Sequence, residues 1–254
     1  MTKRLTAYQI KIIAIIAMLI NHLAHIVVLL PIERGIMNAM LMPMNMIGKL
    51  TLPIMCFFVA EGYYHTRDLK KYLLRMFIFA AISQIPFFLF ELDCVFADIP
   101  QHIGEITHMN VIFSLAMGLL ALTVWKSEKL HIALKIPLIA VITLLTKTAD
   151  WRIFAVLWIL AFAVFRGNFK KQAAAFILLA AVRVFVYYVV PGINPSLSVT
   201  LNIKSVISQS CTVFALIPLY FYNGQHGRKS KYGFYIFYPA HLLVLAAIKF
   251  IIMG

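Results

Sequence analysis

The sequence has few charged residues and very few acidic ones. Of its 254 residues 13% are charged, and nine are Asp or Glu against 23 Lys or Arg. The hydrophobic share is 63% and the mean hydropathy is +0.90, which is more apolar surface than a soluble core of this size can bury. A soluble globular protein is therefore excluded, and the composition predicts an integral membrane protein.

Cysteine is also scarce. Cys56, Cys94 and Cys211 are widely scattered, without a Cys-x-x-Cys pair or a Cys/His ligand spacing, so we expect neither a disulfide framework nor a metal site. The sequence lacks a linker, a low-complexity tract and an internal repeat, and its connections are too short to hold a further folded domain. We expect one polytopic domain over residues 1–254.

Long hydrophobic runs are what the sequence has instead. A helix needs about 20 apolar residues to cross a bilayer, and about nine segments, with a range of eight to ten, approach that length. The segment 151–166 is short and 131–147 is marginal, so this pair is open to a tilted, re-entrant or fused arrangement. The predicted fold class is all-α, a polytopic bundle of transmembrane helices. Its spans are residues 8–30, 45–64, 71–90, 108–125, 131–147, 151–166, 171–190, 200–222 and 232–253.

The basic residues of the connections predict the orientation. Lys and Arg occupy every second connection, and cytoplasmic connections carry this excess, so the N-terminus is expected inside the cell and the C-terminus outside. The net charge of +14 then reflects orientation and anionic headgroups, and we expect no nucleic-acid partner. The acidic stretch 91–105 and residues 191–198 are among the connections expected outside. The expected location is the cytoplasmic (inner) membrane. The basic groups are Lys3 and Arg4; Arg67, Lys70, Lys71 and Arg75; Lys126 and Lys129; Arg166, Lys170 and Lys171; and Arg228, Lys229 and Lys231.

The first span carries a polar cluster. Lys11 and His22 are eleven residues apart, so they share one helix face with about 16 Å between them. His25 follows one turn later on the same side, and Asn21 lies beside His22. Ionisable groups inside a membrane are costly and mark functional sites, so this cluster is our first catalytic candidate. The structural alternatives are a Lys11 that snorkels to the inner headgroups and histidines that serve packing.

Later spans add further polar candidates, each of which also has a structural interpretation. Glu61 and His65 are four residues apart and meet on one helix face, but a single histidine on that turn is a weak metal signal. An ion pair of Glu61 with Arg67 or Arg75 is the structural alternative. The remaining candidates are Lys49 in the second span, Asn110 at the start of the fourth, Asp150 at the mouth of the sixth, Arg183 in the seventh, and Tyr238 and His241 in the ninth.

The turn EGYYHTRDLKKYLLR gathers cations after the second span. His65, Arg67, Lys70, Lys71 and Arg75 are suited to a phosphate-bearing ligand, while plain positive-inside bias explains the same residues equally well. Arg183 lies within an apolar run and needs an anionic partner from the protein or from a ligand.

Several segments carry a family resemblance. KIIAIIAMLINHLAHI, IGKLTLPIMCFFVAEGYYHTRDLKKYLLR, AISQIPFFLF, NVIFSLAMGLLAL, ADWRIFAVLWIL and YPAHLLVL, in that order, resemble the TraX family, whose name-giving member acetylates the N-terminus of conjugative pilin. The resemblance covers nearly the whole chain and is most specific at EGYYHTR, at the following KKYLLR and at SQIP. The family is similar to the wider superfamily of transmembrane acyltransferases, in which a basic residue and a histidine with ten residues between them mark the first span. Lys11 and His22 match that spacing.

The resemblance implies an O- or N-acetyltransferase that takes its acetyl group from cytoplasmic acetyl-CoA. The acceptor would be an amine or hydroxyl of a pilin-like peptide, a glycan or a lipid, and no metal is implied. His22 would act as a general base or acyl carrier, with His25 beside it. The family frequently has Asp at the position of Asn21 and a basic residue, often Arg, at that of Lys49. Because Asn21 cannot stabilise an imidazolium by charge, a carboxylate of Glu61 or Asp150 would have to serve.

Acyl transfer requires a base, hydrogen-bond donors for the oxyanion, and cations that bind the phosphates of acetyl-CoA. These requirements assign roles to the remaining candidates. Donor binding is expected from Lys11, Lys49, His65, Arg67, Lys70, Lys71, Arg75 and Arg183, and acceptor binding or oxyanion donation from Asn110, Tyr238 and His241.

A transporter or flippase for an amphipathic or anionic solute is the alternative function. Prolines within the spans, together with interior His, Glu and Arg, suit a substrate path, but no repeat relates the two halves of the sequence. A purely structural or regulatory membrane partner would leave the interior histidines without a role. Thioester cleavage that depends on His22 separates the enzyme from the transporter.

Overall fold

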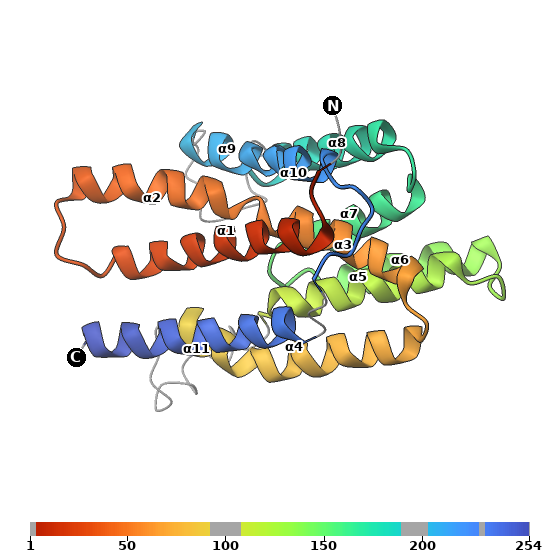
Figure 1. Cartoon of the computed structure of the whole chain (residues 1–254), viewed down its shortest axis with the longest axis horizontal. Coiled ribbons are helices and arrows are strands. Elements are labelled where there is room, and N and C mark those ends of the chain that lie inside the picture. The colour runs from red at the N-terminus through yellow and green to blue at the C-terminus, as the bar shows by residue number, and fades with distance from the viewer. Residues whose placement is uncertain (1–3, 92–107, 189–202, 229–231, 254) are drawn as a thin grey trace. The chain divides into compact units, whose positions relative to one another are not determined.

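A computed structural model describes residues 4–91, 108–188, 203–228 and 232–253 (Figure 1). Apart from two isolated bridges, these residues form no β-structure. Most of the predicted outer connections 91–105 and 191–198 lies outside the described residues, as do Lys3, Cys94, Lys229 and Lys231. The elements are α1 (Ala7–Val27), α2 (Arg34–Gly48), α3 (Thr51–His65), α4 (Leu69–Glu91), α5 (Val111–Lys126), α6 (Ile132–Leu145), α7 (Phe154–Val164), α8 (Phe169–Tyr188), α9 (Ile203–Ser210), the 3₁₀-helix η2 (Cys211–Ala215), α10 (Leu216–Tyr220) and α11 (Gly233–Met253).

The lengths of these helices confirm an all-helical multi-pass membrane protein. Five stretches are long and apolar enough to cross a bilayer: Ala7–Val27, Arg34–His65, Leu69–Glu91, Ile203–Tyr220 and Gly233–Met253. At about 1.5 Å per residue, α6 and α7 reach about 21 and 17 Å, short of an apolar bilayer core of about 30 Å. They are separate helices, so the marginal pair is not fused into one span. The count of nine spans and the cytoplasmic N-terminus stay predictions.

The second span differs from its prediction. A helix already begins at Arg34, eleven residues before the predicted start. The prediction missed this part because Asn38 and Pro43 lower the hydropathy of a segment that is helical nonetheless. The helical run is then interrupted at Lys49 and Leu50. Their backbone N–H groups donate to Met46 at 3.2 Å and to Ile47 at 3.1 Å, three residues back instead of four.

The described chain divides into two compact units. Unit 1 comprises Met1–Met55 and Val164–Lys229, and unit 2 comprises Cys56–Ala163 and Ser230–Gly254. Helix α3 begins in unit 1 and continues in unit 2. Both units combine stretches that are distant in the sequence, and the single domain expected over residues 1–254 stays a prediction.

In unit 1, α1 packs along α2 (Figure 1). The buried residues of α1 are four alanines, Ala14, Ala17 and Ala24 among them, together with Ile10 and Ile26. The hydroxyl of Thr51, at the start of α3, donates to the carbonyl oxygen of Ala14 at 3.0 Å. Helix α1 is capped by Thr6, which accepts the backbone N–H of Gln9. These contacts fix the helix that carries His22.

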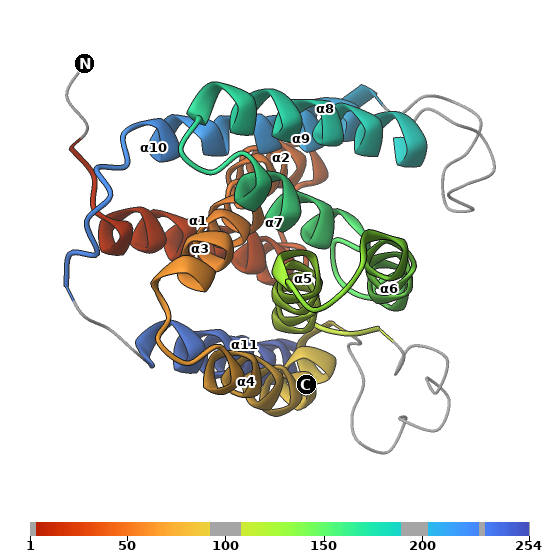
Figure 2. The same ribbon diagram turned by 90° about the vertical axis from the view of Figure 1, so that its right-hand side faces the viewer.

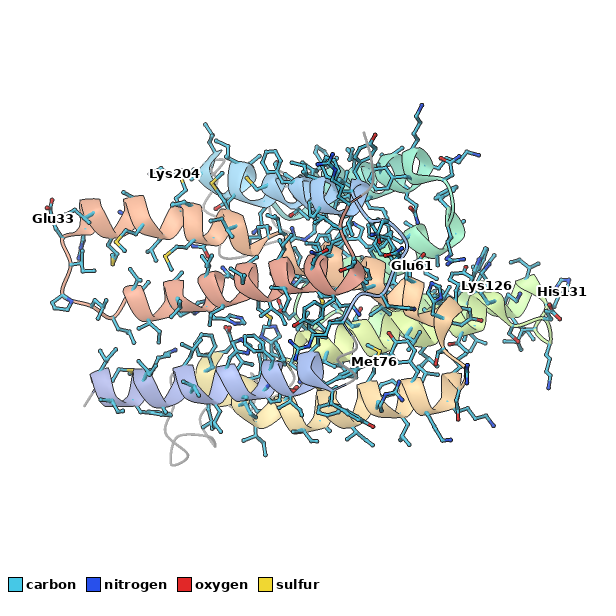
Figure 3. All side chains as sticks on the ribbon, viewed as in Figure 1. Glu33, Glu61, Met76, Lys126, His131 and Lys204 are labelled. Carbon is cyan, nitrogen blue, oxygen red and sulfur yellow. The ribbon has the colours of Figure 1, made fainter. Side chains whose placement is uncertain are left out.

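In unit 2, α4 lies beside α11 and α5, and α5 lies beside α6 (Figure 2). The buried face of α4 is formed by residues at spacings of three and four: Met76, which Figure 3 labels, Ala80, Ser83, Phe87 and Phe90. Helices α4 and α11 are parallel. The rings of Phe79, in the middle of α4, and Tyr235, near the start of α11, stack with centroids 5.0 Å apart. Near the ends of both helices, Lys249 donates to the carbonyl of Phe90 at 2.6 Å. This direction agrees with the predicted orientation of the third and ninth spans.

Candidate functional site

The histidine pair of the first span lies on one side of α1, as its spacing predicts. The rings of His22 and His25 are 6.5 Å apart between centroids and inclined by 67°. Both side chains are partly buried, and Lys11 lies eleven residues before His22 on the same helix. Asn21 belongs to the polar cluster that the sequence indicates as the first catalytic candidate. Its side-chain amide donates to the side-chain oxygen of Asn45 on α2 at 2.9 Å, so this residue ties α1 to α2.

A close approach of the two helices occurs at the same turn of α1. A Cβ on Gly48 would lie 2.3 Å from the Cβ of Asn21. Only glycine fits there, because side-chain Cβ atoms do not come so close. The interruption at Lys49 and Leu50 follows directly, so the break in the second span lies next to the turn that carries His22.

Replacing Gly48 with alanine is therefore expected to destabilise unit 1 by about 1–3 kcal/mol through overpacking. Gly35→Ala is the matched control on the same helix, because its new Cβ would meet only Glu33 Oε1 at 3.5 Å (Glu33 is labelled in Figure 3). Thermal unfolding of both variants in detergent checks this. Equal Tm values for the two variants would contradict it.

Arg183 has a polar partner within unit 1. Its guanidinium donates to the side-chain oxygen of Gln209, on α9, at 2.7 Å. This partner is a neutral amide, and the anionic partner expected from the sequence stays a prediction.

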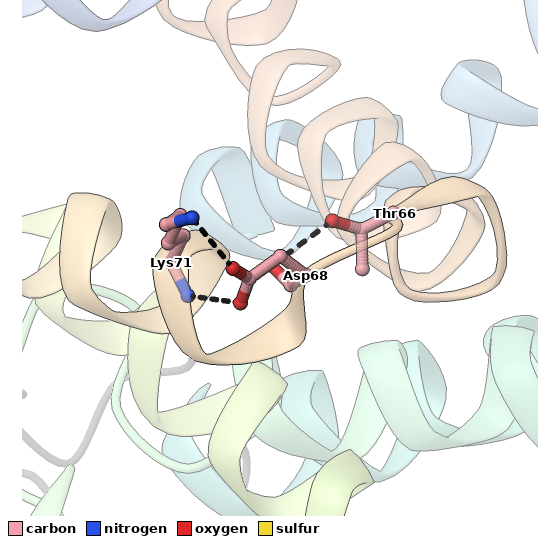
Figure 4. Close-up of polar contacts among 3 residues, drawn as sticks. All are labelled: Thr66, Asp68 and Lys71. Atoms are coloured by element: carbon pink, nitrogen blue, oxygen red, sulfur yellow. Dashed lines mark hydrogen bonds and ion pairs between the residues drawn. The ribbon is translucent and has the colours of Figure 1, made fainter.

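The basic turn between α3 and α4 lies in unit 2, and its acidic residues are paired locally. Glu61 meets His65 at 3.3 Å, as predicted for residues four apart. Asp68 caps α4 and meets the ammonium group of Lys71 at 3.1 Å (Figure 4). The hydrogen bond from the backbone N–H of Lys71, reinforced by its ammonium group, holds the pKa of the Asp68 carboxyl below its usual value. Nowhere among the described residues do three or more His, Cys, Asp or Glu side chains gather as metal ligands would.

Arg75 differs from the other cations of this turn. Its Nε is buried and has no hydrogen-bond partner in the described part of the chain. The guanidinium carbon lies 5.7 Å from the centroid of the Tyr72 ring, and the Tyr235 phenol on α11 also interacts with the Arg75 side chain. Lys71, in contrast, is exposed and already paired with Asp68. A buried guanidinium nitrogen without a partner is suited to an anionic ligand.

Asn110 is completely buried at the start of α5. Its side-chain oxygen accepts the backbone N–H groups of Ile112 and Phe113 at 3.0 and 3.2 Å. Its side-chain nitrogen donates to the carbonyl of Ala80 and to the side-chain oxygen of Gln84, both at 2.7 Å. The amide therefore caps α5 and pins it to α4. The predicted role of Asn110 as a substrate or oxyanion donor would require a ligand to displace one of these partners.

Asp150 lies in a tight turn beside the start of α5. Its backbone N–H donates to Met109 at 2.8 Å, and its carbonyl accepts the hydroxyl of Ser114 at 2.8 Å. The next two residues, Trp151 and Arg152, have φ angles of 60° and 51°. Side chains of this size are rare in the left-handed region and cost about 1–3 kcal/mol each there. This strain was not predictable from the sequence, because neither position is Gly, Asn or Asp.

The ninth-span candidates lie near this turn. The Tyr238 hydroxyl interacts with the backbone of Val111, the first residue of α5, which lies between the two residues that bind the Asp150 backbone. His241 is buried; its Nδ1 is 2.8 Å from the carbonyl oxygen of Phe237, and the two rings stack at 4.7 Å. The structure thus gathers Asn110, Asp150 and Tyr238 around the start of α5, which no sequence spacing indicated.

Two polar residues of unit 2 escaped the sequence analysis. Lys249 is only 4% exposed, and its ammonium group donates to the last turn of α4. A lysine near the end of the last span resembles a snorkelling residue, so its position alone did not mark it as a candidate. Ser83 is fully buried within the SQIP segment, where a lone serine carries no motif of its own.

Comparison with known proteins identifies the family. The chain matches the family described as "TraX protein" over residues 6–249. It is 32% identical over 250 residues to the probable fimbrial assembly protein FimC, serogroup H1, of Dichelobacter nodosus, and the match covers 96% of each chain. No solved structure matches. The chain therefore belongs to the TraX family.

Proposed function

We propose that this protein is an acetyltransferase of the cytoplasmic membrane that uses acetyl-CoA as donor. The observation that carries the proposal is the buried Nε of Arg75, which has no hydrogen-bond partner in the described residues. The turn around Arg75 is basic, so it is suited to an anionic ligand. The acidic residues Glu61 and Asp68 are engaged by His65 and Lys71. The phosphates of a nucleotide-bearing donor would supply the missing anion.

The base of the reaction is His22 in this proposal. Its neighbour His25 and the tight contact between Asn21 and Gly48 belong to the same two turns of α1, which fixes the backbone that carries the imidazole. The imidazole would take the proton from the attacking amine or hydroxyl and pass it to the CoA thiolate that leaves when the thioester C–S bond breaks, or would itself carry the acetyl group from the thioester to the acceptor. Membership in the same family as a fimbrial assembly protein supports a pilin-like peptide as acceptor.

The proposal is tested by thiol release from acetyl-CoA. Purified protein in detergent is incubated with the donor, with and without a membrane and peptide extract that supplies the acceptor. Release that requires both protein and extract supports the transferase. Absence of both thiol release and CoA binding in a well-folded sample would contradict it.

Arg75→Gln is expected to raise the KM for acetyl-CoA by about ten- to a hundredfold, since a charge-assisted hydrogen bond contributes about 1.5–3 kcal/mol. Lys71→Gln is the matched control, because Lys71 is exposed and paired with Asp68, and its KM should change less than about fivefold. Initial rates at varied donor concentration measure both. Equal effects of the two substitutions would refute a specific site at Arg75.

The interruption at Lys49 and Leu50 favours the transporter as the second candidate. Broken spans in transporters expose backbone groups to a solute near the middle of the membrane. A transporter would bind or move its solute without cleaving a thioester, so the same assay distinguishes the two functions.

A further inference from the structure

The turn between α6 and α7 holds two large residues in a conformation that glycine adopts elsewhere in the described chain. Trp151 and Arg152 have φ angles of 60° and 51°. The other left-handed residues among those described are Gly167, Gly224 and Gly227. A side chain in this region costs free energy, and such residues persist where the surrounding structure holds them, most often at functional sites. The two side chains therefore call for a functional explanation.

The rest of unit 2 holds this turn in place. The backbone N–H of Arg152 donates to the carbonyl of Ala149 at 2.8 Å, and Ala149 is buried. The backbone N–H and carbonyl of Asp150 are both bonded to residues around the start of α5. The centroid of the Trp151 ring is 5.9 Å from that of the Trp158 ring, which is completely buried. A rigid backbone thus carries Arg152, whose side chain is exposed.

The length of α4 gives the depth of the turn. Gln84 binds the residues just before α5: its side chain donates to the carbonyl of His108 at 2.8 Å and accepts the N–H of Asn110 at 3.1 Å. Gln84 lies seven residues before Glu91, the end of α4, which is about 10 Å along the helix. The start of α5 and the turn bonded to it therefore lie about 10 Å short of the end of α4.

This depth is inside the membrane. Helix α4 has 23 residues and is about 34 Å long, close to the thickness of the apolar core of a bilayer, so a level 10 Å before its end falls within that core. Irregular backbone and ionisable side chains occur there where they are buried in protein or line a polar cavity. Lipid phosphates lie outside the apolar core. An anionic group that reaches Arg152 is therefore best carried by a molecule that enters the core.

The chemistry of Arg152 indicates the kind of group. A guanidinium is planar and binds both oxygens of a carboxylate through parallel hydrogen bonds. It has five N–H donors, so one contact within a protein does not exhaust them. Arginine and tryptophan are also enriched among the residues that anchor contacts between proteins. An apolar peptide segment that contains one acidic residue matches both the depth and the charge of this turn.

We propose that the turn 149–152 is a docking site for the acceptor peptide, and that Arg152 binds a carboxylate within an apolar segment of that peptide. The identity of this peptide as the acceptor rests on the proposed function. Trp151 is a positioning residue, because its contact with Trp158 holds the strained backbone that carries the guanidinium.

Stability separates a ligand-binding arginine from a structural one. Arg152→Gly places glycine at a left-handed position, so Tm in detergent should stay unchanged or rise. Lys147→Gly is the matched control in the same connection. Lys147 is exposed and its φ is not left-handed, so glycine there should lower Tm by about 1–4 °C. A fall in Tm for Arg152→Gly that equals the fall for Lys147→Gly would mean that the arginine stabilises the turn, for example through Asp150, and would overturn the proposal.

Binding of a designed peptide tests the carboxylate. The probe is a peptide of about 20 residues, made of Leu and Ala with one Glu, and its partner carries Gln in place of Glu. Isothermal titration in detergent at mildly alkaline pH should show that wild-type protein binds the Glu peptide about ten- to a hundredfold more tightly. Arg152→Gln should lose this preference, and Lys147→Gln should keep it. No preference in the wild type, or equal losses in the two variants, would overturn the proposal.

The outcomes also separate this inference from the proposed function, because the titration contains no acetyl-CoA. Acceptor-dependent thiol release by a protein that binds both peptides equally would overturn the docking site and leave the transferase standing. A preference for the Glu peptide that depends on Arg152, in a protein that neither binds CoA nor releases thiol, would retain the docking site and remove the acetyl-CoA assignment. Displacement of the Glu peptide by dihexanoylphosphatidylglycerol would assign Arg152 to lipid headgroups and overturn the peptide site.

Discussion

Replacing His22 with alanine is expected to abolish acetyl transfer while leaving the protein folded. A positioned general base accelerates a reaction by about 10²–10⁴-fold, and an acyl carrier is indispensable. In either case, the rate of thiol release should fall by about a hundredfold or more. The fold should persist, since the printed contacts that tie α1 to α2 are made by Asn21 with Asn45 and Gly48, and not by His22. The measurement is acceptor-dependent thiol release with thermal unfolding of the same sample.

Leu23→Ala is the control for this prediction. Leu23 is the next residue of the same turn and is 36% exposed, so trimming it tests whether any loss of volume there reduces activity. We expect Leu23→Ala to stay near wild-type activity, and His25→Ala to lose less than His22→Ala. Normal transfer by a folded His22→Ala protein would refute the role of His22.

Local spacing explains what could be predicted. The contact between His22 and His25 and the pair of Glu61 with His65 both follow from helix periodicity, and the structure confirms them. The membrane location follows from composition, because no soluble core could hide so much apolar surface. These features depend on neighbours in the sequence, so the sequence alone is sufficient for them.

Contacts between distant segments explain what could not be predicted. Asn21 was named for its place beside His22, and nothing in the sequence indicated its hydrogen bond to Asn45, 24 residues away. Charge alone could not distinguish Arg75 from Lys71, because the difference lies in burial and in the local pairing of Lys71 with Asp68. The helix at residues 34–44 was missed because its Asn and Pro residues lower the hydropathy of a segment that packs on α1.

Replacing Asn110 with alanine is expected to have the largest effect on stability. The substitution removes the cap of α5, worth about 0.5–2 kcal/mol, and the two hydrogen bonds from the side-chain nitrogen to Ala80 and Gln84, worth about 0.5–1.5 kcal/mol each. The expected loss is about 2–5 kcal/mol, a large share of the 5–15 kcal/mol that is typical of folded proteins. Urea or thermal unfolding in detergent measures it.

Asn168→Ala is the matched control for this experiment. Asn168 precedes α8 and accepts the backbone N–H of Lys171 at 3.1 Å, but it is exposed and its described contacts do not join two helices. Its loss should cost about 1 kcal/mol. Similar losses for Asn110 and Asn168 would mean that the two hydrogen bonds from Asn110 to Ala80 and Gln84 contribute little beyond capping.

The same variant separates the two roles of Asn110. If the residue serves only to join α5 to α4, the fraction of Asn110→Ala protein that stays folded at low temperature should retain the wild-type KM for the acceptor. If its amide also binds the acceptor, KM should rise in that folded fraction as well. Because Ala80 and Gln84 already occupy both amide hydrogens, we expect the first result. A raised KM would mean that the ligand displaces one of them, and that α4 moves relative to α5 when the acceptor binds.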